Sequence, residues 1–493
     1  MQIEDEYIRL IFGLKLKQIR TEKKLSLFGL AKLTGLSKSY LNEIEKGKKY
    51  PKTDKIILLS EHLDVPYDHL VSLKLDKNLA PIGEILKSKI LKEIPLDLFG
   101  IQEKNLIDII ANAPAKVNAF ISTIIKIAQN YNLSRESFFL ASLRSYQEAH
   151  NNYFDTIEDD VKTFAKAYHI NLHEKIYSHD LKEILIEEFG YTIDAKTLKK
   201  HKNLTELRSI FIPKNKTLLI SSDITEAQKA FIFAKELAYN FLHLENRLYT
   251  FPWVKFDSFD QVLHNFIASY FAGALIIAKD SLINSLKTFF ANETWDNEKF
   301  FNIIKQYNCS AETFYQRLTN ILPKHFHIKN LFFLRFTHRI ESSKFNLTKE
   351  LHITQQQAPH ANRTNEHYCR RWISIGAIKD LEKSTKKHSF GIQISSYDNS
   401  NSKYLVLSSA TSDPFKQNLN RSVSIGFLIS SHLKKKLKFI NDSNIITRKV
   451  GITCETCAVS NCGERIAEAS KLAKQERYKD IEMTVEKILN SYA

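Results

Sequence analysis

Four residues near the start of the chain impose the strongest constraint on its fold. Ala31, Gly35, Leu41 and Ile44 stand at the spacing that two short helices joined by a tight turn require. A small residue at 31 lets the helices cross closely, and a glycine at 35 permits a left-handed turn. The two apolar residues then seat the second helix on the core. The spacing therefore predicts a helix-turn-helix.

The segment around these residues, from Glu6 to Lys74, carries apolar residues at helical spacing. Turn signals divide it into about five short helices. The breaks are Lys24–Ser26, Thr34–Leu36, Lys48–Thr53 and Asp64–Pro66. We expect an all-α helix-turn-helix bundle over residues 1–75. The alternative is a plain three-helix bundle in which a small residue and a glycine occur by coincidence.

The second helix of this pair has a polar outer face. Ser37 is its expected N-cap. The outward residues would face the major groove of double-stranded DNA, and the lysines that follow would approach phosphates. Asn42 could make a bidentate contact to adenine. The predicted DNA-binding residues are Ser37, Lys38, Ser39, Asn42, Glu43, Lys46, Lys48 and Lys49, with Lys52 as a further phosphate contact.

The segment resembles the phage-repressor (Xre) class of helix-turn-helix proteins. The resemblance extends to Lys46-Gly47-Lys48 after the second helix and to Pro51 before the next one. Helix-turn-helix proteins usually bind two half-sites about one DNA turn apart, so we expect a homodimer. Residues 76–160 read as helix interrupted by prolines, and we interpret them as a helical connector that supports dimerisation.

The charge balance favours an anionic partner. The chain of 493 residues is long enough for about two to four domains, and its 71 Lys and Arg against 55 Asp and Glu give a net charge of +16. Residues 1–75 hold 14 basic and 10 acidic residues, whereas residues 368–450 hold 15 basic and 5 acidic ones. The surplus in residues 368–450 fits either a second anionic partner or a solvated basic face.

A membrane is the weakest of the possible partners. The most apolar stretch, Phe266–Ala278, is shorter than the roughly 20 residues needed to cross a bilayer. The N-terminus carries Glu4-Asp5-Glu6 where a signal peptide would be basic. We therefore expect no membrane partner and a cytoplasmic protein.

The middle of the chain, residues 161–347, mixes helices with strand candidates at Ser209–Ile212 and Thr217–Ser221, which predicts an α+β domain. In a predicted helix over Thr225–Leu244, Lys235-Glu236-Leu237-Ala238-Tyr239 stands where a zinc peptidase carries His-Glu-x-x-His. That motif needs two imidazoles to hold the metal and a carboxylate to take a proton from water. Only the carboxylate of Glu236 remains. Taken alone, this pattern also fits an ordinary amphipathic helix.

A second predicted helix, Phe259–Ala278, follows. The pair of helices resembles the ImmA/IrrE metallopeptidase-like domain, in which the second helix supplies a third, acidic ligand. That position falls on Asn265. The resemblance implies that Lys235, Tyr239 and Asn265 replace all three ligands. We interpret residues 161–347 as a degenerate α+β pseudo-peptidase and expect no enzyme.

A polar stretch, Thr348–His367, leads to a C-terminal α+β unit at residues 368–493. Strands are expected at Phe390–Ser395, Tyr404–Ser408 and Ser422–Ile429. The cysteines of this unit have the spacing of metal ligands, since Cys-x2-Cys-x4-Cys can turn three sulfurs toward one ion and an upstream cysteine can complete the set. Zinc and an iron-sulfur cluster suit four thiolates equally. Incidental thiols are the alternative. The candidate ligands are Cys369, Cys454, Cys457 and Cys462.

The whole architecture, with Cys369-Arg370-Arg371-Trp372 opening the last unit, resembles the short-chain fatty-acyl transcriptional regulators, the PrpR/RamB-like group. The resemblance implies a regulator that senses acyl-coenzyme A or coenzyme A and carries a four-iron four-sulfur (4Fe-4S) cluster. Arg370, Arg371 or Lys434–Lys436 would neutralise phosphates of that effector. Two other functions stay open: an anti-repressor metalloprotease coupled to DNA binding, and a non-sensing prophage or toxin-antitoxin repressor with structural zinc.

Overall fold

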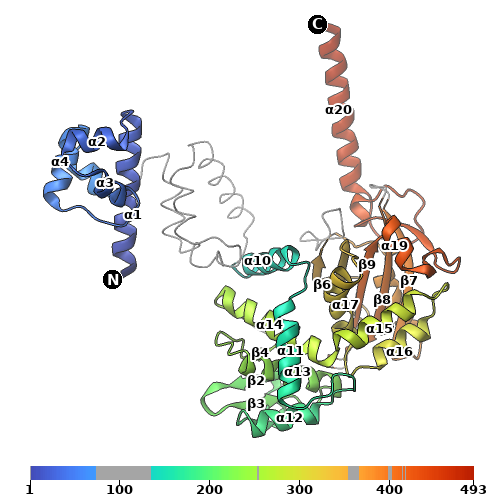
Figure 1. The fold of residues 1–493 in the computed structure, drawn as a ribbon. Coiled ribbons are helices and arrows are strands. Elements are labelled where there is room, and N and C mark those ends of the chain that lie inside the picture. Colours follow the sequence, from blue (N-terminus) through green and yellow to red (C-terminus); the bar gives the residue numbers. More distant parts are fainter. Residues whose placement is uncertain are drawn as a thin grey trace. The chain divides into compact units, whose positions relative to one another are not determined.

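The computed structural model describes residues 2–73, 135–252, 255–353, 366–397, 402–413, 415–416 and 418–492. It divides into two compact units, Met1–Ser142 and Leu143–Ala493 (Figure 1). The predicted connector at residues 76–160 lies outside the described residues as far as residue 134. Each unit is considered by itself.

The N-terminal unit begins with a bundle of five helices, as the breaks in the apolar pattern predict. Its core contains Leu16, Leu30, Leu41 and Leu59, which are fully buried. Gly35 takes φ 68° directly after the second helix, so the turn is left-handed as expected. The helices are α1 (Gln2–Glu22), α2 (Leu27–Thr34), α3 (Lys38–Glu45), α4 (Thr53–Leu63) and α5 (Tyr67–Val71).

The second unit opens with helices around a small sheet. The strands expected near residues 209–212 and 217–221 are present as β2 and β3, and the sheet order is β1-β3-β2-β4. The strands are β1 (Thr192–Asp194), β2 (Ser209–Ile212), β3 (Thr217–Ile220) and β4 (Thr250–Phe251). The helices are α10 (Arg135–Ala149), α11 (Asp155–Ala167), α12 (Ser178–Glu187), α13 (Glu226–Phe241), α14 (Phe259–Ile276), α15 (Lys279–Phe290), α16 (Asn297–Lys305) and α17 (Ala311–His325).

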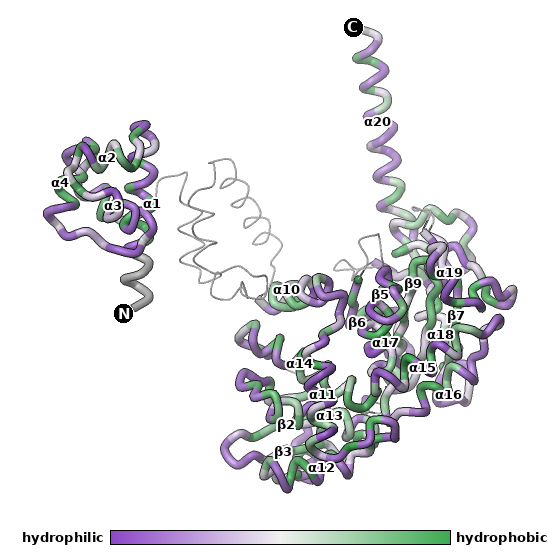
Figure 2. The backbone as a smooth tube through the Cα atoms, in the orientation of Figure 1, coloured by the Kyte–Doolittle hydropathy of each residue, from purple (hydrophilic) through white to green (hydrophobic). Residues whose placement is uncertain are grey.

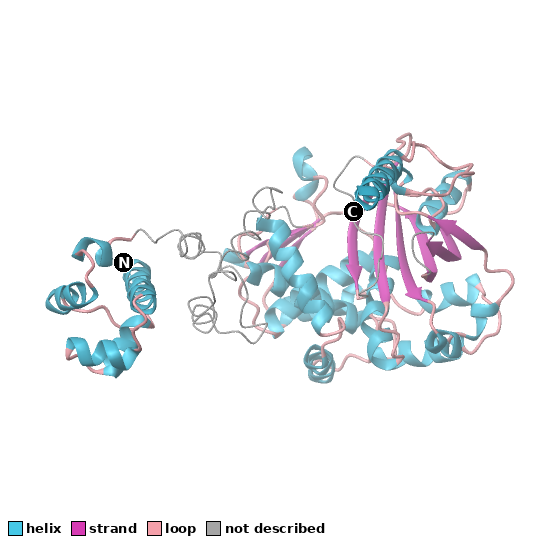
Figure 3. Cartoon of the chain, turned by 90° about the horizontal axis from the view of Figure 1, so that it is seen from above, coloured by secondary structure: helices cyan, strands magenta, loops and turns pink. Residues whose placement is uncertain are grey.

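A larger sheet of six strands follows, in the order β10-β7-β8-β9-β5-β6. It is the larger group of magenta arrows in Figure 3. All neighbouring pairs are antiparallel except the parallel pair β10–β7. The strands are β5 (Leu331–Arg339), β6 (Phe345–His352), β7 (His388–Tyr397), β8 (Lys403–Ser412), β9 (Leu419–Leu428) and β10 (Thr447–Val450), and the remaining helices are α18 (Ile373–Lys383), α19 (Ser431–Lys436) and α20 (Ser470–Tyr492).

The two faces of the six-stranded sheet belong to different cores because alternate residues of a strand point to opposite sides. Leu405 and Leu407 share a core with α17, whereas Tyr404 and Val406 share one with α18. The sheet is therefore covered by α17 on one face and by α18 on the other.

The structure differs from the predicted domain boundary between residues 347 and 368. Strands β5 and β6, assigned from the sequence largely to the pseudo-peptidase domain, pair with each other and with β9. Thr348, the expected start of a polar linker, lies inside β6. One apolar core then runs from Tyr153 to Ile445. The sequence pattern could not reveal this because the partner strand β9 lies about eighty residues further along the chain.

Helix α14 is the most apolar helix of the core, and its second half from Ala268 onward is almost completely buried. Figure 2 colours the backbone by the hydropathy of each residue. Within the described residues, no single helix has the length and apolar content needed to cross a membrane. Only α14 and α15 taken together reach those limits, and the two are bent by 64° relative to each other.

Candidate functional site

Helix α3 presents the residues predicted to read DNA. The Ser37 hydroxyl accepts a hydrogen bond from the Tyr40 backbone N–H at 3.1 Å, which confirms the predicted N-cap. Leu41 and Ile44 are fully buried and fix the helix to the core. On the other side, Ser37, Lys38 and Ser39 are exposed and Asn42 and Glu43 are half-buried.

Two contacts that the sequence analysis missed hold α3 against α1. The Arg20 guanidinium binds both carboxylate oxygens of Glu45, at 2.6 and 3.0 Å. At Gly13, an added Cβ would lie 2.3 Å from the backbone oxygen of Ile44, so only glycine allows this approach. A glycine inside an otherwise regular helical pattern is the sequence signal of such a contact.

The lysines after α3 differ in their surroundings. Lys46 and Lys48 are exposed. The Lys49 ammonium lies 2.8 Å from the Glu43 carboxylate, and this hydrogen bond lowers the pKa of Glu43. Lys46 and Lys48 are therefore the most available phosphate contacts, because Lys49 must first exchange its carboxylate partner.

The residues that the resemblance places at the metal-ligand positions lie on α13 and α14, and we call Lys235, Tyr239 and Asn265 the ligand-position residues. Lys235 and Asn265, which the sequence places at two of the three ligand positions, are in direct contact: the Lys235 ammonium donates to the Asn265 side-chain oxygen at 2.5 Å. The ammonium also lies 4.9 Å from the centre of the Phe251 ring and 5.8 Å from that of Tyr239. Burial lowers the pKa of Lys235 to about 8. A fixed cation thus occupies the region where the peptidases hold a metal.

Glu236, the carboxylate of the motif, also has partners within the protein. Glu236 forms a buried ion pair with Arg247 and accepts a hydrogen bond from the Tyr191 hydroxyl at 3.1 Å. The Arg247 guanidinium lies 3.8 Å from the centre of the Phe211 ring and 4.3 Å from that of Tyr239. Arg247 and Tyr191 were not identified from the sequence. Both contacts are made by one carboxylate oxygen, Oε2 of Glu236, which is therefore committed to Arg247 and Tyr191.

Three of the four predicted cysteine ligands are buried and lie close together. Burial and then the neighbouring sulfurs of Cys457 and Cys454 raise the pKa of Cys369 to about 11, and Cys462 is half-exposed. Arg465 closes the loop by donating to the backbone oxygens of Cys454 and Cys457. In the part of the chain that the structure describes, however, no group of three or more His, Cys, Asp or Glu residues is positioned to hold a metal ion.

The two arginines predicted to bind an effector have limited access to solvent. Arg370 is buried, donates to the Ser343 backbone oxygen, and lies 4.4 Å from the centre of the Phe345 ring. It therefore anchors the turn between β5 and β6. Arg371 is half-buried, and Lys434–Lys436 on α19 are exposed.

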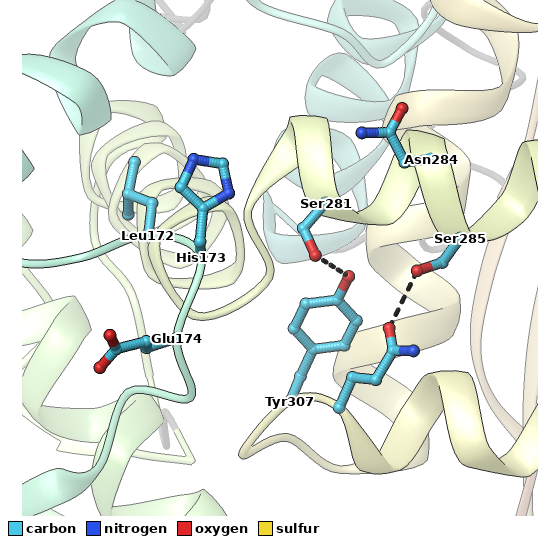
Figure 4. Close-up of a pocket in the computed structure, with 8 residues that line it drawn as sticks. Leu172, His173, Glu174, Ser281, Asn284, Ser285 and Tyr307 are labelled. Atoms are coloured by element: carbon cyan, nitrogen blue, oxygen red, sulfur yellow. Dashed lines mark hydrogen bonds between the residues drawn. The ribbon is translucent and has the colours of Figure 1, made fainter.

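A cavity of about 460 Å³ lies elsewhere in the second unit (Figure 4). The polar groups on one side bind each other: the Tyr307 hydroxyl contacts Ser281 at 3.2 Å, and Ser285 donates to Gln306 at 2.9 Å. Because these groups already have partners, the cavity offers little specific recognition. Its lining residues are Leu172, His173, Glu174, Ser281, Asn284, Ser285, Gln306 and Tyr307.

Comparisons with known proteins agree with the two motifs. A family model described as helix-turn-helix matches residues 16–70, and a model described as IrrE N-terminal-like domain matches residues 176–319. No curated protein matches the chain. The chain thus joins an Xre-type helix-turn-helix to an IrrE-like α+β domain, which supports a DNA-binding regulator.

One solved structure, a Mycobacterium tuberculosis transcriptional regulator, is similar at 16% sequence identity and a TM-score of 0.46. The alignment covers 66% of this chain and 92% of that chain.

Proposed function

We propose that this chain is a sequence-specific, DNA-binding transcriptional regulator of the cytoplasm, in which the IrrE-like region controls DNA binding and has no peptidase activity. The proposal rests on how α3 is held against the core of its bundle. Its apolar side is fully buried, its start is capped by Ser37, and its polar side is exposed toward the solvent. Such a helix enters the major groove in helix-turn-helix complexes.

The test is binding of the full chain to its own promoter region, compared with random duplex of equal length. Specific binding should weaken as salt rises, because phosphate contacts release counterions. Replacing Asn42 by Ala should reduce the preference for the specific site. A matched control is Lys199→Ala, an exposed lysine in the second unit. Equal affinity for specific and random DNA would reject the proposal.

The metalloprotease alternative receives less support. Both imidazoles of the motif are missing, the residues in the ligand positions bind each other, and the carboxylate of Glu236 is paired with Arg247. A protease would need a metal ligand set at α13 and α14. Cleavage of a partner that stops in Glu236→Gln, with folding intact, would restore this alternative.

The effector and the cofactor are proposed from the resemblance to short-chain fatty-acyl regulators. We propose acyl-coenzyme A or coenzyme A as the effector and an iron-sulfur cluster on the cysteines, with structural zinc as the alternative. Anaerobic purification separates these outcomes: iron with acid-labile sulfide supports the cluster, zinc alone supports the alternative, and a metal-free folded protein contradicts both.

We also propose that the chain is a homodimer, and α20 supports this. Its apolar residues Tyr478, Ile481, Val485 and Ile488 follow the alternating spacing of three and four residues found in coiled coils. Their exposed fractions are 57%, 49%, 48% and 52%. Helix α20 extends away from the rest of its unit (Figure 1). An apolar stripe of this kind is stabilised by a second copy of the same helix.

Charges beside the stripe favour a parallel pair. Arg477 and Glu482 flank it on opposite sides, five residues apart, which is the spacing of the interhelical ion pair in parallel coiled coils. Light scattering of the full chain should give the mass of a dimer, and Ile481→Lys together with Ile488→Lys should shift it to the monomer. Lys479→Ala, on the opposite side of the helix, is the control. A monomeric wild type would reject the pairing.

A further inference from the structure

Two strands of the large sheet place like charges directly opposite each other. Arg335 on β5 pairs in register with Lys349 on β6. Arg421 on β9 lies opposite Thr337, two residues along β5 from Arg335, so it projects from the same face. Like charges at such positions destabilise a sheet. An arrangement that breaks this rule needs a compensating reason.

Only part of this charge is neutralised by the protein. The Glu312 carboxylate, from α17, lies 2.8 Å from Arg335, 3.5 Å from Arg421 and 3.9 Å from Lys349. Arg421 also pairs with Asp413. Arg208, directly before β2, interacts electrostatically with these residues. Burial and then the charge of Arg421 lower the pKa of Arg208, and the charges of Glu312 and Asp413 act in the opposite direction.

Four cations therefore share two carboxylates among the residues that the structure describes. We call Arg208, Arg335, Lys349 and Arg421 the cation cluster. The Asp413 carboxylate has little capacity left, because it also accepts from the backbone N–H groups of Phe415 and Lys416. In addition, the buried Nε of Arg421 has no hydrogen-bond partner.

The electrostatics agree with a cation surplus. Burial alone would raise the pKa of Glu312, but the surrounding cations lower this pKa to about 2. Burial and the two neighbouring arginines lower the pKa of Lys349 to about 8 despite its contact with Glu312. Lys349 nevertheless keeps 45% of its side chain exposed. Solvent, and hence a soluble ligand, can therefore reach the Lys349 side chain, although Arg335 and Arg421 lie beside it.

The cation cluster also lies near one of the ligand-position residues, Lys235. The charge of Lys349 contributes to the lowered pKa of Lys235, so a fifth cation lies within electrostatic range. The carboxylate next to Lys235 in the chain, Glu236, is already paired with Arg247. The local excess of positive charge thus extends from the large sheet to α13.

We infer that the cation cluster binds a small molecule bearing adjacent phosphate groups. Guanidinium groups match phosphate oxygens in a bidentate manner, and several cations converging on one region suit a pyrophosphate better than a single carboxylate. Free pyrophosphate, a nucleoside diphosphate and coenzyme A share this chemistry. The site is distinct from Arg370 and Arg371, and it does not depend on the proposed DNA-binding function.

The experiment measures thermal stability and binding heat of the full chain with inorganic pyrophosphate, ADP or coenzyme A at constant ionic strength. At a ligand concentration about 100 times Kd, the melting temperature of the second unit should rise by roughly 5 °C. Lys349→Gln and Arg335→Gln should each weaken binding at least about tenfold, the scale of one charge-assisted contact. Lys403→Gln, an exposed lysine at the far end of β8, should leave binding unchanged.

A second readout separates binding from folding. Without ligand, Lys349→Gln should melt no lower than the wild type, because it removes a like charge opposite Arg335. Binding of coenzyme A or ADP in preference to pyrophosphate identifies the larger molecule as the source of the phosphates. The inference is overturned if none of the three ligands binds, or if Lys349→Gln and Arg335→Gln bind like the wild type. Promoter binding is measured in parallel: failure of all three ligands to bind would contradict this inference and the proposed coenzyme A effector, but it would leave the proposed DNA-binding function standing.

Discussion

The helix-turn-helix and the ligand-position residues use polar side chains in opposite ways. The polar residues of α3 lie on the solvent side of the helix, whereas Lys235 and Glu236 of α13 are buried and bind Asn265 and Arg247. Lys235 is 6% exposed and Glu236 is 6% exposed. The comparison teaches that the polar residues of α3 remain accessible to a partner molecule, whereas those of α13 are already bound within the protein.

The largest expected effect concerns the buried pair of α13. Glu236→Gln should destabilise the second unit by about 4 kcal/mol, because it leaves the charge of Arg247 buried without its counter-ion. Urea unfolding measures this loss. The double variant Glu236→Leu with Arg247→Met should be less destabilised than the single one. DNA affinity of the folded fraction should stay within twofold of wild type, and a selective loss of DNA binding would break the comparison.

The next effect concerns the contact between α1 and α3. Gly13→Ala should cost about 3 kcal/mol, since the new methyl group overlaps the backbone oxygen of Ile44, which cannot move without shifting α3. DNA binding should fall with the stability of the bundle. Gly29→Ala is the matched control, because its nearest neighbour would be a side-chain oxygen at 3.3 Å. Equal stability of the two variants would contradict the assigned role of Gly13.

A smaller effect of opposite sign is expected at Lys235. Its pKa is about 8 in the folded protein, below the ordinary value of 10.5, so below pH 8 the folded state carries a charge that burial disfavours. Between these two values the unfolded chain binds more protons, and stability contributed by this group rises with pH. Lys235→Met should therefore stabilise the protein by about 2 kcal/mol at pH 7.

The advantage of Lys235→Met should shrink as the pH approaches 10. Chemical unfolding at several pH values checks this, with the exposed Lys182→Met as control. A difference between Lys235→Met and wild type that does not change with pH would show that the ammonium is not the cause.

The smallest effect is expected on the surface of the helix-turn-helix. Lys48→Ala should weaken DNA binding by about fivefold. It should also reduce the slope of log affinity against log salt concentration by about 1, as expected for the loss of one phosphate contact. Stability should be unchanged because Lys48 is exposed. Fluorescence anisotropy across a salt series measures both quantities. An unchanged slope would exclude Lys48 from the DNA interface.

Local patterns accounted for what the sequence could predict. The turn at Gly35 and the cap at Ser37 follow from spacing within and between two short helices. The positions of Lys235 and Asn265 in one site were implied by the resemblance to the ImmA/IrrE domain, and their direct contact was seen only in the structure. Contacts between distant segments were not accessible. The register of β5 with β9 and the like-charged pair Arg335–Lys349 depend on pairing that no short-range periodicity encodes.

Gly13 and Arg247 illustrate the remaining gap. Gly13 interrupts a regular helical pattern, whereas Arg247 has no comparable sequence signal. In both cases the partner is set by the fold: the backbone oxygen of Ile44 for Gly13 and the carboxylate of Glu236 for Arg247. Such roles become visible only when the tertiary structure is known.

The contact of Lys235 with Asn265 differs from a metal site in what the cell must provide to form it. A zinc ion must be delivered and can be withdrawn by a chelator, whereas an ammonium group is made with the chain and is present in every copy. The link that Lys235 makes between α13 and α14 therefore needs no metal supply, and its strength varies with pH instead.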